Sequence, residues 1–396
     1  MRKTLKSRER NRLLPGAGLF VLLVSAAATA QAGALQPLAV PPEAPSAAAE
    51  EARRRGIAYL LKSQNEDGSW GRFESARPWE VYLGSVASHR AFRAATSALC
   101  VLALLGPAQR DTEVQQALER GLHYLLEEPP LYRATGEVLY NVWGHGYVLQ
   151  AMSAVLGAGR LSAFHSRARK VAQREIKLLR ELQGADGGWS YYDFQFARQH
   201  PTGRISTSFT TAAVLVALHE ARLAGLEVAA PCTDAALRSL SRLRRPDGAY
   251  IYGLYLRLRP EHLANHVQGS LGRSQSCNLA LWLHQHGVGE EELERGLENL
   301  SRFHHFIEMG KSRPYPHESW YATAGYYFFF GHYYAARIAR ELPAEKGRRF
   351  LAELRETIIR LQDEDGSWWD FPFYGYHKPY GTAFALLTLD LARETK

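Results

Sequence analysis

One short phrase returns along this chain, and it constrains the fold more than any other feature. The phrase is a glutamine, a glycine four residues later and a tryptophan two residues after that glycine. It follows amphipathic stretches at Gln64/Gly68/Trp70, Gln183/Gly187/Trp189 and Gln362/Gly366/Trp368. A fourth copy, Arg244/Gly248/Tyr250, replaces the glutamine by arginine and the tryptophan by tyrosine. Repetition of so specific a phrase indicates stacked repeat units.

The aromatic ends of these phrases are about 60 residues apart, or about twice that distance, which predicts two further units with degraded phrases. One helix-like stretch, 121–126, runs into Pro129 and Pro130. Another, 296–300, runs into a proline-containing loop. We therefore expect six units in the chain.

Each unit contains two helical stretches of different character. The first is amphipathic, as in 175–180 and 353–360, with charged residues on its outer face. The second is apolar nearly all round, as expected of a helix buried on most sides. These second stretches are 96–105, 144–152, 210–218, 276–282, 323–328 and 381–387. The predicted fold class is all-α, a closed (α/α)6 toroid with six apolar helices inside and six amphipathic helices outside. An open solenoid is the alternative, but its ends would expose apolar surface without polar caps.

The repeated phrase resembles the repeat of squalene and hopene cyclases and of the β subunits of protein prenyltransferases. The resemblance covers about residues 50–392. The residues also have a physical reading as a fastener between helices: the glutamine bonds exposed backbone groups, Asp-Gly makes the turn, and the tryptophan covers the joint. The acidic run 363–365 in the last copy is interpreted as a solvated turn.

The resemblance implies where catalytic groups would lie, and this chain departs from both patterns. Hopene-type cyclases use an Asp-x-Asp-Asp acid, and no such tetrad occurs in the sequence. Prenyltransferases bind zinc through an Asp-x-Cys pair and a later histidine; Cys277 matches the cysteine, but Gln275 and Gly381 stand at the other positions. Zinc needs at least three protein ligands, and the metal-like histidine spacing in 261–266 also lacks a third one. We expect no metal and no cofactor, and it stays open whether the chain is an enzyme.

Residues 1–32 resemble a signal peptide. Basic residues through Arg12 precede the apolar run 19–24, and small residues lead to Ala32. We expect cleavage after Ala32, export to the periplasm or the extracellular space, and no transmembrane helix afterwards. An uncleaved membrane anchor is the alternative.

A proline- and alanine-rich segment, 33–46, is predicted to be a flexible linker, and 47–396 form the toroid domain. The net charge is +8, but residues 1–32 hold six Lys or Arg against one acid, which leaves +3 for the rest. So weak a field argues against a nucleic-acid partner.

The chain has three cysteines, Cys100, Cys232 and Cys277. An odd number without local spacing favours buried thiols over a disulfide framework. One disulfide stays open as an alternative, because export would favour it.

Ionisable residues near the starts of the inner helices form one set of candidate site residues. A histidine and a carboxylate that meet at one mouth of the toroid could act as base and acid. The candidates are His145, Asp193, His317, Glu318, His332 and Asp370. A structural role is the alternative for each. The sequence contains no Gly-x-Ser-x-Gly elbow, phosphate-binding loop or dinucleotide-binding glycine motif.

Aromatic residues crowd the C-terminal part of the chain: of 44 Phe, Trp and Tyr residues, 19 lie between Tyr315 and Phe384. Such rings could line a cavity and hold a cationic or polyene ligand, or stack on sugars. Rings in loops are expected to face this cavity more often than the helix residues Phe328–Phe330 do. The loop rings are Tyr192, Tyr321, Trp369, Tyr374 and Tyr376. Plain core packing is the alternative.

Three functions follow as hypotheses. The first is a binding module that holds an isoprenoid-like or other lipidic ligand in the aromatic cavity. The second is an enzyme that acts on saccharides with a carboxylate and histidine site at one mouth, by analogy with other α/α toroids. The third is a scaffold whose outer face binds protein. A dry cavity with a few convergent carboxylates would favour the first, and an open groove with exposed Trp and Tyr rings and paired carboxylates the second. The absence of any cavity would contradict both.

Overall fold

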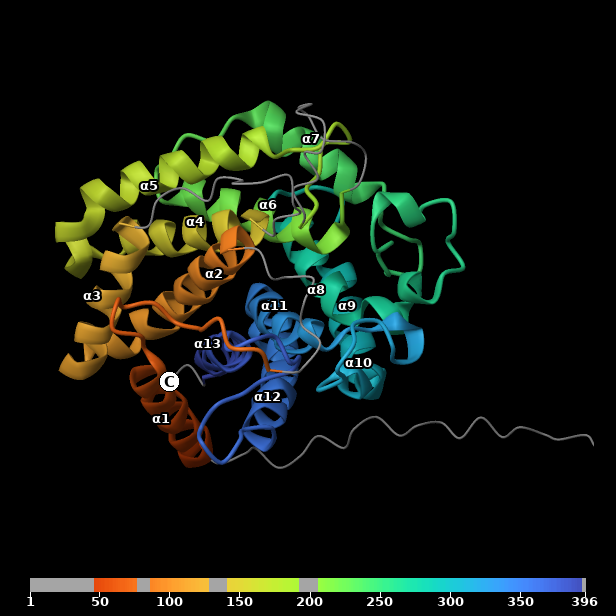
Figure 1. Ribbon diagram of the computed structural model, residues 1–396. Helices are drawn as coiled ribbons and strands as arrows, with labels where there is room; N and C mark the ends of the chain where they lie inside the picture. Colours follow the sequence, from red (N-terminus) through yellow and green to blue (C-terminus); the bar gives the residue numbers. More distant parts are fainter. Residues whose placement is uncertain (1–45, 77–85, 128–140, 192–205, 394–396) are drawn as a thin grey trace, which may run out of the picture. The chain divides into compact units, whose positions relative to one another are not determined.

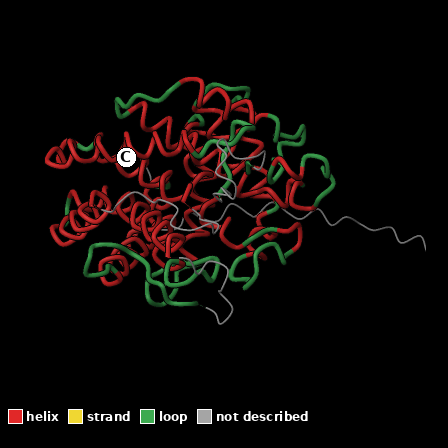
Figure 2. The backbone as a smooth tube through the Cα atoms, turned by 45° about the horizontal axis from the view of Figure 1, so that its top comes forward, coloured by secondary structure: helices red, strands yellow, loops and turns green. Residues whose placement is uncertain are grey.

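The computed structural model describes residues 46–76, 86–127, 141–191 and 206–393. The predicted signal peptide and nearly all of the predicted linker lie outside these ranges. Within them the regular structure is all-helical, and β-type pairing is limited to isolated bridges such as that between Gln64 and Trp70 (Figure 2). None of the described helices combines the length and the apolar character needed to cross a bilayer.

The described helices form six pairs, as the sequence predicts. The inner helices are α2 (Val86–Leu105), α4 (Asn141–Gly157), α6 (Ser208–Leu223), α8 (Val267–Leu283), α11 (Phe328–Glu341) and α13 (His377–Leu391). Each follows an outer helix, and these are α1 (Ser46–Ser63), α3 (Thr112–Glu127), α5 (Ser162–Glu181), α7 (Ala230–Ser241), α9 (Glu290–Arg302) and α12 (Ala344–Arg360). A short helix, α10 (His304–Gly310), extends the fifth unit.

The inner helices form a closed ring. Each contacts the next, in the order α2, α4, α6, α8, α11 and α13, and α13 returns to contact α2. The outer helix α1 likewise lies against α12 and α13, so the first and last units are neighbours (Figure 1). Closure explains why neither end carries a polar cap, because no unit leaves its apolar face exposed.

Burial follows the two hydrophobic patterns. The outer helix α9 buries Leu293, Gly296, Leu297 and Leu300, a stripe with spacings of three and four residues, while its glutamates remain outside. The inner helix α4 is buried over most of its length. The prediction of an inner apolar ring and an outer amphipathic ring is therefore confirmed.

One predicted boundary is wrong. The fifth inner helix was expected over 323–328, but α11 begins at Phe328 and a short 3-10 turn, Gly325–Tyr327, precedes it. The reason is a close backbone approach: a Cβ atom on Gly325 would lie 2.5 Å from the carbonyl oxygen of Asp370 and 2.8 Å from that of Gly310. These contacts hold the segment against the last unit's loop as a turn.

The repeated phrase joins consecutive units. The Gln64 side-chain amide donates to the carbonyl oxygen of Gly68 at 2.9 Å and to that of Ala117, on the next outer helix, at 2.8 Å. The Trp70 indole N–H donates to the Leu60 carbonyl at 2.8 Å. This copy therefore closes its own turn and also satisfies a carbonyl of the neighbouring outer helix.

The other two full copies make the same glutamine contacts. Gln183 donates to Gly187 and Cys232, and Gln362 donates to Gly366 and Ala52. The last of these acceptors belongs to α1, so the phrase of the sixth unit fastens the end of the chain to its first helix.

The tryptophans fill the joints from inside, whereas the sequence reasoning expected them to cover the joints. Trp368, like Trp70 and Trp189, is fully buried. Its indole N–H donates to the Ile358 carbonyl oxygen at 2.7 Å. A Cβ atom at Gly56 of α1 would lie 2.6 Å from the Trp368 ring, so the ring packs directly on the backbone of the first helix. Trp368 is therefore a core residue at the seam where the ring closes.

Glycine is required in each full copy for two reasons. Gly68, Gly187 and Gly366 have φ values of 83°, 88° and 85°, in the left-handed region that favours glycine. A Cβ atom at Gly68 would also lie 2.3 Å from the Arg120 carbonyl oxygen of the next outer helix. The turn and the close packing of units therefore depend on the same residue.

The fourth copy departs from this pattern at its glycine. Gly248 keeps the left-handed conformation, with a φ of 85°. A Cβ atom there would meet no backbone, because the nearest atom is Nε of the Arg295 side chain at 3.3 Å. The turn therefore requires Gly248, but the packing of the next outer helix does not.

The aromatic residue and the first residue of the fourth copy also make different contacts. Tyr250 is fully buried, and its hydroxyl donates to Asn278 Oδ1 of α8 at 2.9 Å. The tryptophans of the full copies instead donate to a carbonyl oxygen of the outer helix before them. Arg244 donates to the Gly287 carbonyl oxygen at 2.5 Å. This copy still joins two units, but it does so through different hydrogen bonds.

All three cysteines are free thiols, as favoured by the sequence. Cys100 and Cys277 are fully buried, and burial raises the pKa of the Cys277 thiol to about 12. These two thiols are apolar core residues at neutral pH.

Candidate functional site

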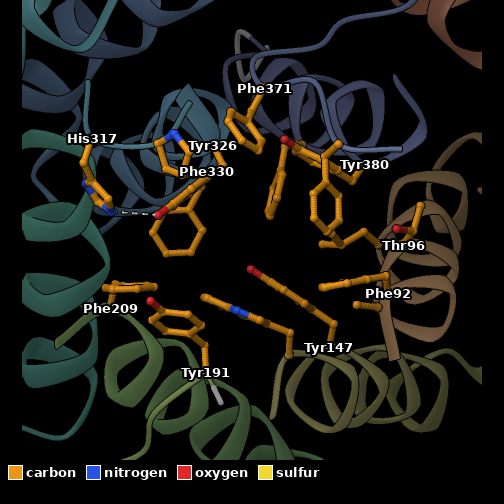
Figure 3. Close-up of a pocket in the computed structure, with 16 residues that line it drawn as sticks. Phe92, Thr96, Tyr147, Tyr191, Phe209, His317, Tyr326, Phe330, Phe371 and Tyr380 are labelled. Atoms are coloured by element: carbon orange, nitrogen blue, oxygen red, sulfur yellow. Dashed lines mark hydrogen bonds between the residues drawn. The ribbon is translucent and has the colours of Figure 1, made fainter. Parts of the chain in front are cut away.

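A cavity of about 300 Å³ lies among the N-terminal halves of the inner helices and the loops beside them (Figure 3). Eleven of its 16 lining residues carry a Phe, Tyr or Trp ring. The lining consists of Phe92, Ala95, Thr96, Leu99, Trp143, Tyr147, Tyr191, Phe209, Pro316, His317, Tyr326, Phe330, Phe371, Phe373, Tyr380 and Phe384. The described lining contains no Asp, Glu, Lys or Arg side chain.

Helix periodicity explains how the inner helices reach the cavity. From α2 come Phe92, Ala95, Thr96 and Leu99, which have the i, i+3, i+4, i+7 spacing of one helix face. Helix α13 supplies a pair four residues apart in the same way, as does α4. The described lining takes side chains from α2, α4, α6, α11 and α13, and none from α8. Each of these five helices also contacts an outer helix, so it has one face toward that helix and one toward the cavity.

Aromatic rings from different units meet in the cavity wall. Trp143 of α4 stacks on Phe209 of α6, with ring centroids 5.8 Å apart and an angle of 27° between the planes. The edge of Phe330, from α11, meets Trp143 with a centroid distance of 6.1 Å. Tyr147 contacts Phe384 of α13 at 5.9 Å. The wall is therefore built by side chains that lie far apart in the sequence.

Two hydrogen-bonded pairs interrupt the apolar wall, and the first is His317 with Tyr326. His317 Nδ1 lies 2.7 Å from the carbonyl oxygen of Ala322, which can only accept, so Nδ1 carries a proton. Burial lowers the pKa of His317, and the neutral ring then has an unprotonated Nε2. Tyr326, 3.2 Å away, donates its hydroxyl proton to this nitrogen (Figure 3).

The second pair is Asp370 with Tyr380. The Tyr380 hydroxyl, at the start of α13, donates to Asp370 Oδ1 at 2.5 Å. The backbone N–H of Phe329, in the first turn of α11, donates to Asp370 Oδ2 at 3.1 Å. Burial nevertheless raises the pKa of this fully buried carboxyl to about 6. Asp370 therefore lies behind Tyr380 and acts on the cavity through it.

A buried arginine lies one layer behind the wall. Arg273 donates to the carbonyl oxygens of Gly269 at 2.7 Å and Ala264 at 2.6 Å, and its guanidinium lies 5.0 Å from the ring centroid of Tyr252. Its charge also contributes to the lowered pKa of His317. Arg273 therefore helps keep that histidine neutral.

Of the six ionisable candidates, the structure brings two to the cavity. His317 lines it, and Asp370 supports its wall. Glu318 is exposed and accepts from the backbone of Tyr315 at 3.4 Å. Asp193 lies outside the described residues.

The remaining two candidates lie elsewhere, each buried between an inner and an outer helix. His145 faces α5, where its Nδ1 is 2.5 Å from the carboxylate of Glu175. His332 is 2.9 Å from His304 of α10, and burial lowers its pKa to about 3. Both sit on the outward-facing side of their inner helix, so neither contributes to a site at the cavity.

The four described loop aromatics that were predicted to face the cavity are not among its lining residues. Tyr374 and Tyr376 form a separate cluster with Phe92, behind the wall, and Tyr376 lies 3.0 Å from His89 Nδ1. Trp369 packs edge-on against His377. Tyr321 meets the ring edge of Phe306, and Tyr192 is outside the described residues. These rings therefore pack against other side chains of the protein, and Tyr374 and Tyr376 do so on α2.

The inner-helix residues of the wall were missed by the sequence reasoning. Phe330 was expected to face the cavity less than the loop aromatics, yet it lines the cavity. Phe92, Trp143 and Phe209 line it as well. These helices are apolar nearly all round, so no stripe in their sequence marks the face toward the cavity.

The histidines with metal-like spacing make local contacts. His262 Nδ1 accepts from the backbone N–H of Ala264 at 3.2 Å, and His266 Nε2 bonds the carbonyl oxygen of Glu261 at 3.1 Å. Across the described ranges, no group of three or more His, Cys, Asp or Glu side chains could hold a metal ion.

Comparison with known proteins adds a sequence likeness over part of the chain. No protein-family model matches it. A stretch of 148 residues, 35% of this chain, is 26% identical to squalene–hopene cyclase of Zymomonas mobilis subsp. mobilis (strain ATCC 31821 / ZM4 / CP4). The match spans 21% of that protein's length.

Solved structures with the same fold cover most of the chain. The α-1,6-mannanase GH76A of Salegentibacter sp. HEL1_6 aligns with 87% of this chain and 100% of its own, with a TM-score of 0.56 at 11% identity. The type II terpene cyclase MstE from Scytonema aligns with 87% of this chain and 98% of its own, with a TM-score of 0.50 at 14% identity. Such low identities establish the fold alone. The chain therefore has the α/α toroid fold of these enzymes, and part of its sequence is similar to a squalene–hopene cyclase.

Proposed function

We propose that the protein binds an isoprenoid-like or similarly apolar small molecule in its aromatic cavity. The observation that carries this proposal is the chemistry of the wall: eleven aromatic rings and no charged side chain among the 16 lining residues. Burying an apolar ligand against such a surface is favourable by about 25 cal/mol per Å². Ring faces would also stabilise a ligand with cationic character.

The size of the cavity supports a small ligand. Its volume of about 300 Å³ is at the lower end of the range for small-molecule sites, about 300–1,000 Å³. A ten-carbon isoprenoid is a small ligand of this class and serves as a first probe.

A saccharide enzyme is less well supported by the same wall. Glycosidases place two carboxyl groups about 5–10 Å apart on either side of the bond that they cleave. The described lining has no carboxylate, and Asp370, which lies nearby, is buried behind Tyr380. The fold is similar to that of a mannanase, but this similarity is no evidence for a pair of carboxyl groups at the cavity.

Native mass spectrometry of the protein purified from its own cell envelope tests the proposal. We expect a retained apolar molecule that organic solvent extracts. Ala95→Phe places an extra ring in the cavity and should abolish retention, whereas the matched change Ala58→Phe, at an exposed position of α1, should leave it intact. Equal retention by both variants would contradict the proposal.

Export is part of the same proposal. The basic and apolar N-terminal stretch supports it, and N-terminal sequencing of the purified protein reports whether the chain is cleaved after Ala32.

A further inference from the structure

The polar side of the cavity wall has a defined hydrogen-bond direction. Tyr380 donates its proton to Asp370 Oδ1 at 2.5 Å. The carboxylate has no proton to return when it is ionised, and its other oxygen already accepts from the backbone N–H of Phe329. The proton of Tyr380 is therefore committed away from the cavity, and its oxygen offers lone pairs to a ligand.

Tyr326 is oriented in the same sense. Because His317 Nδ1 donates to the carbonyl oxygen of Ala322, Nε2 of the neutral ring can only accept. Tyr326 must therefore donate to it over 3.2 Å. The two phenol groups belong to different units, yet both direct their protons to partners in the protein.

Three further hydroxyls belong to the lining, those of Thr96, Tyr147 and Tyr191. The Tyr147 hydroxyl points into the cavity (Figure 3) and interacts with Tyr334, whereas Tyr191 interacts with Tyr252. The Thr96 hydroxyl can rotate and serve as donor or acceptor. The preference for one kind of polar ligand group therefore rests with Tyr380, supported by Tyr326.

We infer that the cavity selects apolar molecules that carry a hydrogen-bond donor, such as an isoprenoid alcohol, and that Tyr380, oriented by Asp370, accepts the donor's proton. This inference rests on the proposed function, because it assumes an apolar ligand in the cavity. The aromatic rings contact the hydrocarbon part, and Tyr380 recognises the head group. A ligand whose polar group can only accept would meet a lone pair of Tyr380 and lose affinity.

Three ten-carbon probes separate the inference from the proposed function. Geraniol has a hydroxyl donor, geranyl methyl ether has an oxygen that only accepts, and myrcene has no polar group. Isothermal titration calorimetry of the full chain should show binding of myrcene, which reports on the apolar cavity alone. Geraniol should bind about tenfold more tightly than its methyl ether, the difference expected for one hydrogen bond.

Two variants should reduce the ratio of the affinities for geraniol and its methyl ether by at least about threefold. One lowers the affinity for geraniol, and the other raises the affinity for the methyl ether. Tyr380→Phe removes the acceptor, so the affinity for geraniol falls. Asp370→Asn keeps the acceptor for Phe329 N–H and adds an amide donor toward the Tyr380 oxygen, which frees the phenol proton for the ligand. The affinity for the methyl ether then rises. The control Tyr147→Phe should weaken both probes equally, and thermal melting of each variant checks that it is folded.

The outcomes are distinguishable. Equal binding of geraniol and its methyl ether by the wild type, with myrcene bound, overturns the inference and leaves the proposed function standing. Failure of all three probes to bind overturns both. A difference that survives Tyr380→Phe and Asp370→Asn shows that another group recognises the head group, and it also overturns the inference.

Discussion

Replacing one tryptophan of the repeated phrase should cost several kcal/mol of folding free energy. Trp189 is fully buried at the joint between α5 and its neighbours, and its indole N–H donates to the Leu179 carbonyl at 2.7 Å. A buried aromatic side chain removes about 200 Å² from water, worth about 5 kcal/mol at 25 cal/mol per Å². The hydrogen bond adds about 1 kcal/mol. Partial collapse of the site offsets some of this sum, so Trp189→Ala should cost about 3–5 kcal/mol.

The matched control is Trp320→Ala, the same change at a side chain that is 73% exposed. It should alter the free energy of unfolding by no more than about 0.5 kcal/mol. A third variant, Trp189→Phe, keeps a buried ring but loses the hydrogen bond to Leu179. Its loss in the free energy of unfolding should lie between those of Trp189→Ala and Trp320→Ala.

Urea unfolding followed by far-UV circular dichroism measures these differences, with intrinsic fluorescence as a second probe of two-state behaviour. A loss below about 1 kcal/mol for Trp189→Ala, or one equal to that of Trp320→Ala, would refute the claim that the phrase fastens the units.

Two further predictions concern Asp370 and the seam of the ring. Because the pKa of Asp370 is raised from 3.8 to about 6 in the folded protein, the native state holds a proton between those pH values that the unfolded chain has lost. The contribution of Asp370 to stability should therefore be greatest below about pH 4 and fall by about 3 kcal/mol as pH rises to about 6. Asp370→Asn should remove this fall, and parallel pH profiles of urea unfolding for both proteins would contradict it. Gln362→Ala removes the 2.8 Å bond to Ala52 and should cost about 1–3 kcal/mol. Hydrogen exchange should then quicken in α1, whereas Gln183→Ala should leave α1 unchanged, and equal protection of α1 in both variants would speak against a seam.

The helix pairs were predictable because their signals are local. The glutamine of each full phrase bonds a glycine four residues away, and the tryptophan bonds a carbonyl ten residues before it, as in Gln64 with Gly68 and Trp70 with Leu60. The degraded second and fifth units were found by spacing alone, and both are helix pairs in the structure. The start of the fifth inner helix was not predictable, because the contact between Gly325 and Asp370 that moves it is long-range.

The contacts between units were predictable only in part. The φ of Gly248 follows from its turn, as in the other copies. The absence of backbone contacts around a Cβ atom at Gly248 depends on the distance to the fifth outer helix, which the turn's own sequence does not encode. The contact of Trp368 with Gly56 joins the two ends of the chain, and no local pattern encodes it.

The candidate site was predictable only in part. His317 was marked by its place before the fifth inner helix and Asp370 by its place after the last aromatic residue of the repeated phrase; His317 lines the cavity and Asp370 supports its wall. Their hydrogen-bond partners, Tyr326 and Tyr380, were not singled out. Their pairing depends on where two loops meet the ring, and no pattern within either loop encodes that meeting.

The sequence by itself determined the number of units, the two classes of helix and the residues at each joint, because turn chemistry and helix periodicity act over a few residues. Only the tertiary structure decided which rings face the cavity. A buried helix is apolar on every side, so its composition does not tell the face toward the outer helix from the face toward the centre. Closing the ring sets that rotation, and it brings Phe92, Trp143, Phe209 and Tyr380 from four units around one space.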